Sequence, residues 1–194
     1  MASSPSVPTD RPLQVLGFAG SLRSGSFNRR LVEAARDVAP PSLEVTAFDL
    51  DGIPLYNRDL EAEGVPERVQ AFHEAIEAAD ALLIATPEYQ HGVPGVLKNA
   101  IDWASRPPGE APILQKPVAI LGATPGMWGT ARAQSQLRQA LVYNGCPMVL
   151  KPEVLVAKAG ERFDEDGRLA HQATRDFVEE LLRSLEDLAR RHGD

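Results

Sequence analysis

The stretch LQVLGFAGSLRSGSFN, residues 13–28, sets the organisation of the chain. Its first part is short, rich in branched residues and glycine-containing, which predicts a strand buried on both faces over residues 13–19. Residues 20–28 then hold two glycines, three serines and Arg23 before a helical pattern begins. A strand, a polar loop and a helix together point backbone N–H groups and the positive end of a helix dipole at an anion. An ordinary turn rich in small residues is the alternative.

The side chains of this loop indicate which anion it would bind. Serine hydroxyls are neutral donors, and the guanidinium of Arg23 is a charged fork suited to phosphate. The loop has neither the glycine spacing of the dinucleotide fingerprint nor the GK[ST] ending of a P-loop. We therefore expect the phosphate of a mononucleotide.

Length and composition limit the class of protein. With 194 residues, of which 43% are hydrophobic, the chain suits one domain with a sizeable core. Residues 1–12 are polar and proline-rich, so we expect a disordered lead-in there and a single domain over 13–194. A net charge of -7, without a long basic or apolar run, argues against nucleic-acid and membrane partners.

Cysteine and histidine usage indicates where the chain resides and which sites it lacks. The single cysteine, Cys146, excludes an internal disulfide and favours a reducing, cytoplasmic location. It stands in an apolar stretch, so we interpret it as a core residue and not as a nucleophile. The four histidines have no metal-ligand spacing, and we expect no metal site.

Apolar patterning continues the strand and helix alternation. It predicts further strands at 43–50, 81–85, 117–122 and within 147–156. Apolar residues three and four apart predict helices at 31–38, 66–79, 96–104 and 131–143, and a final helix with Phe177, Leu181, Leu185 and Leu188 inward. Residues 51–64 read as an irregular connection, in which Tyr56 either covers something or packs locally.

Five strands alternating with five helices predict a parallel sheet with helices on both faces and right-handed crossovers. Three loops of unusual composition follow the first, third and fourth strands. In the strand order 2-1-3-4-5 these strands are neighbours, so their loops line one crevice at the carboxyl edge of the sheet. The second loop, TPEYQHGVPG at 86–95, offers an aromatic ring and backbone N–H groups, and the third, at 123–130, offers small residues. A planar heteroaromatic ring on a phosphorylated tail fits this set, and FMN is such a molecule.

The motifs GSLRSGSFN, TPEYQHGVPGVLKNAIDWASR and GATPGMWGTARAQ, in this order, resemble the NADPH-dependent FMN reductase family. The resemblance is greatest to the chromate- and quinone-reducing members, and it covers the chain from residue 13 to the last helix. It implies a flavodoxin-like three-layer sandwich of α/β class with a five-stranded parallel sheet. It also implies that FMN is the cofactor and that NADPH and a small-molecule acceptor are the substrates.

The resemblance assigns FMN-binding residues in each loop. Around the phosphate it implies Ser21, Arg23, Ser26, Phe27 and Asn28. Along the isoalloxazine and ribityl groups it implies Pro87, Glu88, Tyr89 and Gln90, with His91 and Gly92 nearby, and on the other side Ala123, Thr124 and Gly126. The chain has Gln90 where the family commonly has asparagine. It also has Ala123 and Gly129-Thr130 where serine and paired glycines are frequent.

The implied reaction is transfer of a hydride from NADPH to flavin N5, followed by electron transfer to a quinone, chromate, an azo compound or free flavin. FMN carries this chemistry, so we assign no catalytic side chain. Glu88 and Tyr89 either tune the flavin or are structural. The alternatives are a flavodoxin-type electron carrier that does not oxidise NADPH, and a flavin-free structural or regulatory relative. The resemblance suggests a homodimer or homotetramer. Tyr56, Trp103 and Trp128 are candidates to form an interface or to cover a ligand. For Trp103, burial in the core is the alternative.

Overall fold

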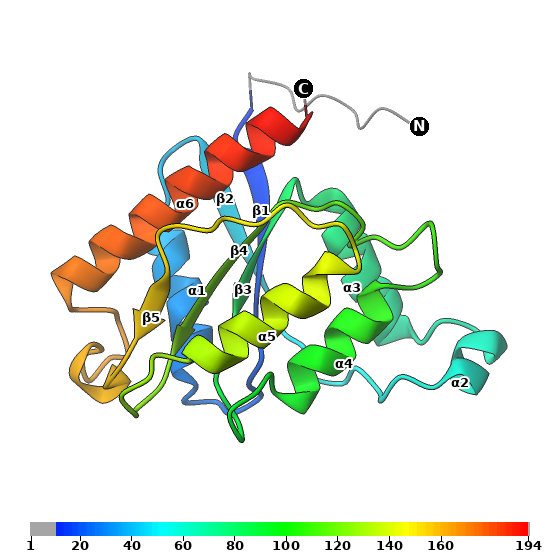
Figure 1. Ribbon diagram of the computed structural model, residues 1–194, viewed down its shortest axis with the longest axis horizontal. Helices are drawn as coiled ribbons and strands as arrows, with labels where there is room; N and C mark the ends of the chain where they lie inside the picture. Colours follow the sequence, from blue (N-terminus) through cyan, green and yellow to red (C-terminus); the bar gives the residue numbers. More distant parts are fainter. Residues whose placement is uncertain (1–10, 194) are drawn as a thin grey trace.

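The computed structural model describes residues 11–193 and contains one five-stranded parallel sheet (Figure 1). The strand order is β2-β1-β3-β4-β5, which confirms the predicted topology. The strands are β1 (Leu13–Ala19), β2 (Leu43–Phe48), β3 (Ala81–Ala85), β4 (Val118–Ala123) and β5 (Val154–Val156). The helices are α1 (Phe27–Val38), α2 (Arg58–Glu63), α3 (Glu67–Ala78), α4 (Gly95–Ala104), α5 (Ala131–Val142) and α6 (Gln172–Gly193), with a short 3-10 turn at Ala159–Glu161.

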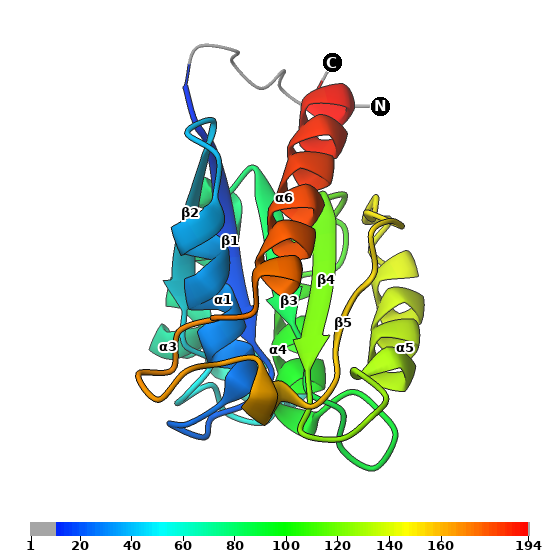
Figure 2. The same ribbon diagram turned by 90° about the vertical axis from the view of Figure 1, so that its left-hand side faces the viewer.

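Helices cover both faces of the sheet, so the core has two halves. Figure 2 shows α1 and α6 in front of the sheet, with α3, α4 and α5 behind it. Within β1, Leu13 and Val15 pack toward α1 and α6, whereas Leu16 and Phe18 pack toward the other three helices. This alternation explains why β1 reads as a continuous apolar run.

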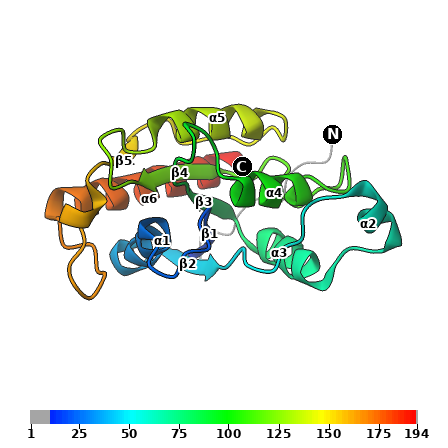
Figure 3. The same ribbon diagram turned by 90° about the horizontal axis from the view of Figure 1, so that it is seen from below.

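The connection at 51–64 is not wholly irregular, because it contains α2. This helix buries none of its residues, so it lacks the apolar periodicity that would have predicted it. It lies at one end of the molecule, beside α3 (Figure 3). The Tyr56 hydroxyl donates to Glu61 of this helix at 2.9 Å, and Arg106 donates to the same carboxylate at 3.0 Å. Tyr56 therefore packs locally.

Trp103 is a core residue and not a ligand cover, because none of its surface is exposed. Its indole N–H donates to Pro54 O at 2.8 Å, and its ring meets the ring of Tyr56 edge to face at 5.0 Å between centroids. Burial and the hydrogen bond to Glu61 raise the pKa of Tyr56. Cys146 is also buried, and burial raises the pKa of its thiol to about 11, as suits a core residue.

One prediction near the C-terminus was wrong, whereas the fifth strand lies within the predicted range 147–156. Phe177 was expected inward but is 52% exposed, because the buried face of α6 is carried by Val178, Leu182 and their neighbours. The fifth strand is only three residues long, although Met148 also forms an isolated parallel bridge to Val118. Pro152, which cannot donate to a ladder, separates the two pieces.

The amino edge of the sheet, where the strands begin, is held by ion pairs and backbone contacts. Arg11 binds Asp80 at 2.7 Å, and the same carboxylate accepts the backbone N–H of Gln14 at 2.8 Å. Lys116 donates to the carbonyl of Ala79. The predicted disordered lead-in at 1–12 lies outside the described residues except for Arg11 and Pro12.

Candidate functional site

A cavity of about 510 Å³ opens at the carboxyl edge of the sheet, above β1, β3 and β4. All three loops that the sequence singled out contribute to it, as their places in the strand order require. The lining residues are Ser21, Arg23, Ser26, Phe27, Asn28, Pro87, Glu88, Tyr89, Ala123, Thr124 and Pro125. Of the predicted site residues, those outside this lining are Gln90, His91, Gly92 and Gly126.

The first loop ends at the N-terminus of α1, where an anion would be favoured. Ser26 caps the helix, and its hydroxyl accepts the backbone N–H of Arg29 at 3.4 Å. By helix geometry, the N–H groups of Phe27 and Asn28 have no partner within the helix. The guanidinium of Arg23 lies 5.9 Å from the ring centroid of Phe27, and no carboxylate within residues 11–193 pairs with it. Free donors and a positive charge therefore gather at this end of the cavity.

Asn28 has a structural task in the cavity wall. Its side-chain amide donates to Ala123 O and accepts from Ala123 N, both at 2.9 Å. The residue is 3% exposed, so this pair of hydrogen bonds is shielded from water. It fixes the first loop to the end of β4, and leaves the backbone N–H of Asn28 as its contact toward a ligand.

The second loop contains a tight turn with an unusual backbone. Tyr89 and Gly92 exchange two backbone hydrogen bonds, of 3.1 and 2.9 Å, around Gln90 and His91. These two residues have φ values of 50° and 62°, in the left-handed region that type I′ turns require. Asparagine tolerates this region better than glutamine, so this backbone conformation suits Gln90 poorly.

Gln136 of α5 holds this turn from outside. Its side chain accepts the backbone N–H of Val93 and donates to His91 O, each at 3.3 Å. A Cβ atom on Gly92 would lie 2.7 Å from the Gln136 side-chain oxygen, so a larger residue there would require the Gln136 side chain to move. The helical periodicity of 131–143 identified only the inward face of α5, and nothing in the local pattern indicated this contact.

Glu88 connects the second loop to α5. Its carboxylate accepts the backbone N–H of Arg132 at 3.0 Å and that of Ala133 at 3.2 Å. The Arg132 guanidinium donates to the same carboxylate at 3.2 Å and lies 4.7 Å from the ring centroid of Trp128. An acidic group at a helix N-terminus satisfies free N–H groups and the helix dipole. The negative charge of Glu88 is thus matched within the protein.

Tyr89 presents an aromatic face at the cavity. Its hydroxyl donates to Ser21 at 3.2 Å, which joins the first and second loops, while 53% of the residue remains exposed. Trp128, on the third loop, is 66% exposed. Tyr56 packs locally and Trp103 is buried, so of Tyr56, Trp103 and Trp128 only Trp128 is exposed enough to cover a ligand.

The third loop is anchored to the edge of the sheet. The backbone N–H of Thr124 donates to Val156 O at 3.0 Å, and Gly126 O accepts the N–H of Lys158 at 2.9 Å. This second contact turns Gly126 toward the segment after β5. Thr130 is fully buried with a φ of 67°, which a glycine would adopt without strain.

Neither a metal-binding cluster nor a helix able to span a membrane is found in the described part of the chain. Residues 11–193 contain no group of three or more histidine, cysteine, aspartate or glutamate residues placed to hold a metal ion. No helix in that range is both long enough and apolar enough to cross a membrane.

Comparisons with known proteins agree with this geometry. The model of the NADPH-dependent FMN reductase family matches residues 13–161. An NAD(P)H-dependent FMN reductase of Pseudomonas aeruginosa is 50% identical over 179 residues, covering 92% of this chain and 96% of that protein. A 2-hydroxy-1,4-benzoquinone reductase of a Burkholderia species is 40% identical over 170 residues, covering 88% and 92%. The solved flavoenzyme NAD(P)H:(acceptor) oxidoreductase of Paracoccus denitrificans superposes with a TM-score of 0.85 at 36% identity, covering 94% of this chain and 100% of that one.

Proposed function

Because the chain belongs to the NADPH-dependent FMN reductase family, we propose that it is an FMN-dependent oxidoreductase that takes electrons from NAD(P)H. Its relatives named as quinone reductases support a quinone as the acceptor. Chromate, azo compounds and free flavin are the other acceptors that such a site would admit.

The observation that carries this proposal is the cavity at the carboxyl edge of the sheet. At about 510 Å³ it lies in the range of small-molecule and cofactor sites. It combines a helix N-terminus and Arg23 at one end with small residues and the ring of Tyr89 at the other. FMN needs this set, since it has a doubly charged phosphate, a polar ribityl chain and a flat ring. The residues present therefore fit the cofactor.

Each loop would have its own part in holding FMN. Arg23, the hydroxyls of Ser21 and Ser26 and the first N–H groups of α1 would bind the phosphate. From the second loop Pro87 and Tyr89 would face the ring, and from the third loop Ala123 and Thr124 would line the space beside it. Bound FMN supplies the two-electron redox chemistry, so the protein has to orient it and exclude competing reactions.

Hydrogen bonds within the protein hold the loops around the expected ring position. Glu88 attaches the second loop to α5, and Gln136 clamps the turn on its outer side. Asn28 attaches the first loop to β4. Preorganised donors need not rearrange during the reaction, which is how a protein site lowers a barrier by electrostatics. Glu88 accordingly acts by positioning the loop.

The proposal includes the setting of the reaction. A homodimer or homotetramer is supported by the exposed apolar residues before, on and after α5, among them Trp128, Val142, Tyr143 and Leu150. The single cysteine supports a reducing, cytoplasmic location.

Anaerobic mixing of the FMN-loaded protein with NADPH tests the proposal. Rapid bleaching of the yellow flavin is expected, followed by recolouring when a quinone is added. A flavin that stays yellow would indicate an electron carrier instead. A colourless protein that cannot be reconstituted with FMN would indicate a flavin-free relative, and either result would overturn the proposal.

A further inference from the structure

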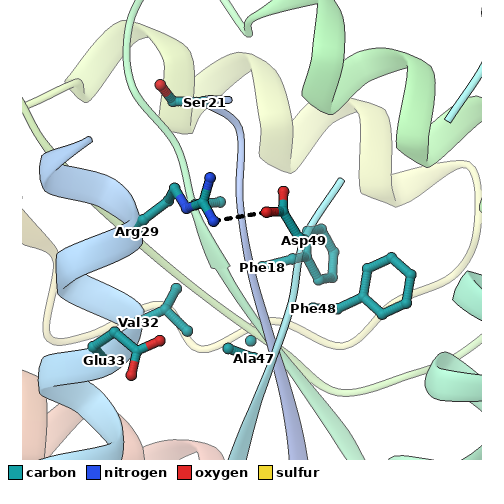
Figure 4. Close-up of a pocket in the computed structure, with 10 residues that line it drawn as sticks. Phe18, Ser21, Arg29, Val32, Glu33, Ala47, Phe48 and Asp49 are labelled. Carbon is teal, nitrogen blue, oxygen red and sulfur yellow. Dashed lines mark hydrogen bonds and ion pairs between the residues drawn. The ribbon is translucent and has the colours of Figure 1, made fainter. Parts of the chain in front are cut away.

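A second, smaller cavity lies beside the FMN pocket, between α1 and the carboxyl ends of β1 and β2 (Figure 4). Its volume is about 180 Å³, which is about six water molecules at the density of the liquid. That is room for one sugar ring, but not for a flavin or a whole dinucleotide. Its walls come from α1 and from the ends of two strands, and include Ser21, Arg29, Val32, Glu33, Phe48 and Asp49.

An arginine and an aspartate face each other across this cavity. The Arg29 guanidinium donates to Asp49 at 2.6 Å, and Figure 4 shows this pair spanning the space between α1 and the end of β2. Arg29 has five N–H donors, and Asp49 is the only described residue to which its side chain donates. The other Asp49 oxygen accepts, among the described residues, only the N–H of Asp51, at 3.1 Å. Both side chains therefore keep hydrogen-bonding capacity for a ligand.

Asp49 lies in a turn that Arg68 holds through hydrogen bonds to the backbone. Arg68 of α3 donates to the backbone carbonyls of Asp49 and Asp51, the latter at 2.9 Å. Its guanidinium also lies 4.3 Å from the ring centroid of Phe48, a favourable cation–π distance. The end of β2 is thus held from the α3 side, and the carboxylate of Asp49 is presented at a fixed place on the α1 side.

The cavity lining holds one arginine and two carboxylates, so its hydrogen-bonding groups, and not its net charge, indicate the ligand. Glu33 is engaged by Arg36, 2.8 Å away, and Asp49 is engaged by Arg29, so neither carboxylate is left without a positive partner. A cationic ligand would have to displace an arginine. A phosphate would instead use the N–H groups of Arg29 that have no partner within the described chain, and a sugar hydroxyl would donate to Asp49.

The place of the cavity connects it to the FMN pocket. Ser21 lines both cavities, so the two cavities adjoin at this residue. A nucleotide stacked on the flavin would extend past Ser21 into the smaller cavity. In Rossmann dinucleotide-binding domains, an acidic residue about 20 residues beyond the first turn accepts from the adenosine ribose of NAD, or a nearby arginine accommodates the 2′-phosphate of NADP. This chain lacks the glycine fingerprint of that fold, but it places both residue types together in the cavity. Asp49 directly follows β2. Arg29 is the matching arginine.

We propose that this cavity binds the adenosine ribose of the pyridine nucleotide, with Asp49 accepting from a ribose hydroxyl and Arg29 donating to the 2′-phosphate. The inference rests on the proposed function and makes Arg29 the residue that sets preference for NADPH over NADH. With NADH, both ribose hydroxyls are free to donate to Asp49, so the site accepts either nucleotide.

Binding of adenosine fragments to the FMN-loaded protein tests this inference without any turnover. Calorimetric dissociation constants are compared for adenosine 2′,5′-bisphosphate and adenosine 5′-monophosphate. The bisphosphate is expected to bind roughly tenfold more tightly, and Arg29→Gln should remove that preference while leaving the dissociation constant of FMN unchanged. Arg183→Gln is the matched control, because it breaks an exposed arginine–carboxylate pair of 2.7 Å on α6.

Glu33→Gln gives a result that misfolding cannot imitate. This change removes a negative charge beside the expected phosphate, so the bisphosphate should bind about two- to threefold more tightly. In steady-state assays, Arg29→Gln should raise KM for NADPH, with kcat and the KM for NADH nearly unchanged. Equal binding of both fragments to the wild type, or an unchanged bisphosphate affinity in Arg29→Gln, would overturn the inference. Failure of NADPH to bleach the flavin would overturn the proposed function, but it would leave the fragment experiment readable.

Discussion

The two edges of the sheet are built from the same strands but in opposite ways. At the amino edge, Asp80 joins Arg11 and the backbone of Gln14. At the carboxyl edge, Gln90, His91, Thr130 and Lys158 have left-handed backbones, against Gln115 alone among the described non-glycine residues of the amino edge. Arg23, also at the carboxyl edge, has no carboxylate partner within the described chain. Strained residues and uncommitted charges persist where the surrounding structure holds them, and they gather at functional sites. The contrast indicates that the amino edge stabilises the fold and the carboxyl edge serves a ligand.

The largest expected effect tests whether the carboxyl edge is rigid. A Cβ atom at Gly122, near the end of β4, would collide with Thr130 and with the backbone oxygen of Thr86. Gly122→Ala should lower the free energy of unfolding by about 3 kcal/mol, measured by urea denaturation. Gly95→Ala is the control, since no atom lies within 4 Å of the place its methyl group would take, and the change should be neutral or slightly stabilising. A tolerated Gly122→Ala would show that this edge is loose.

Arg23→Ala separates ligand binding from stability. Removing a charged donor to a phosphate should weaken FMN binding by about 1.5 to 3 kcal/mol, while the unfolding free energy of the FMN-free protein stays nearly constant. Fluorescence titration with FMN measures the first quantity and urea denaturation the second. Unchanged FMN affinity would remove Arg23 from the phosphate site.

Asp80→Asn makes the converse change at the amino edge. It should cost about 1 to 2 kcal/mol of stability without altering FMN affinity. Burial alone would raise the pKa of Asp80, but hydrogen bonds from Arg11 and Gln14 and the charges of Arg11 and Lys116 lower it overall. Its stabilising contribution is therefore present above the unfolded-state pKa of about 3.9 and is lost as pH falls through the folded-state value.

The lowered pKa of Asp80 determines how the effect of Asp80→Asn depends on pH. Stabilities of the wild type and the variant should differ at neutral pH and converge in acid, as followed by thermal unfolding at a series of pH values. A difference that persists in strong acid would mean that Asp80 acts through shape and not through charge.

Gln90→Asn is expected to have the smallest effect. Asparagine adopts positive φ more readily than glutamine, so the variant should be more stable by about 0.5 kcal/mol. Gln139→Asn, on the exposed side of α5, should change stability by a similar amount in the opposite direction, because asparagine is the poorer helix former. Loss of stability in Gln90→Asn would show that the turn does not strain residue 90.

The sequence predicted the features of the fold that depend on the local pattern of apolar residues. Strand runs such as 13–19 and 81–85 are apolar throughout because both faces are buried, and the strand order then brings the three loops together. It did not predict α2, which has no buried face, or the exposure of Phe177, which depends on how α6 is rotated against the sheet.

Contacts between residues far apart in the sequence could not be predicted from the local pattern either. The sequence favours neither a tuning nor a structural role for Glu88, because its contact with the N-terminus of α5 joins residues 44 positions apart. The Arg29–Asp49 pair was not anticipated at all, since one residue was read as part of a loop-to-helix segment and the other as part of a strand. Only the packing of α1 against β2 brings them together.

The two hydrogen bonds between Asn28 and Ala123 also bear on the order in which the protein assembles. They join residues 95 positions apart, and one partner belongs to β4, so they form only after β4 has joined the sheet. Contacts of such long range close late, because the chain entropy of the intervening loop must first be overcome. We therefore expect a chain emerging from the ribosome to have no complete flavin site until well past its midpoint, which makes cofactor loading a late event in its maturation.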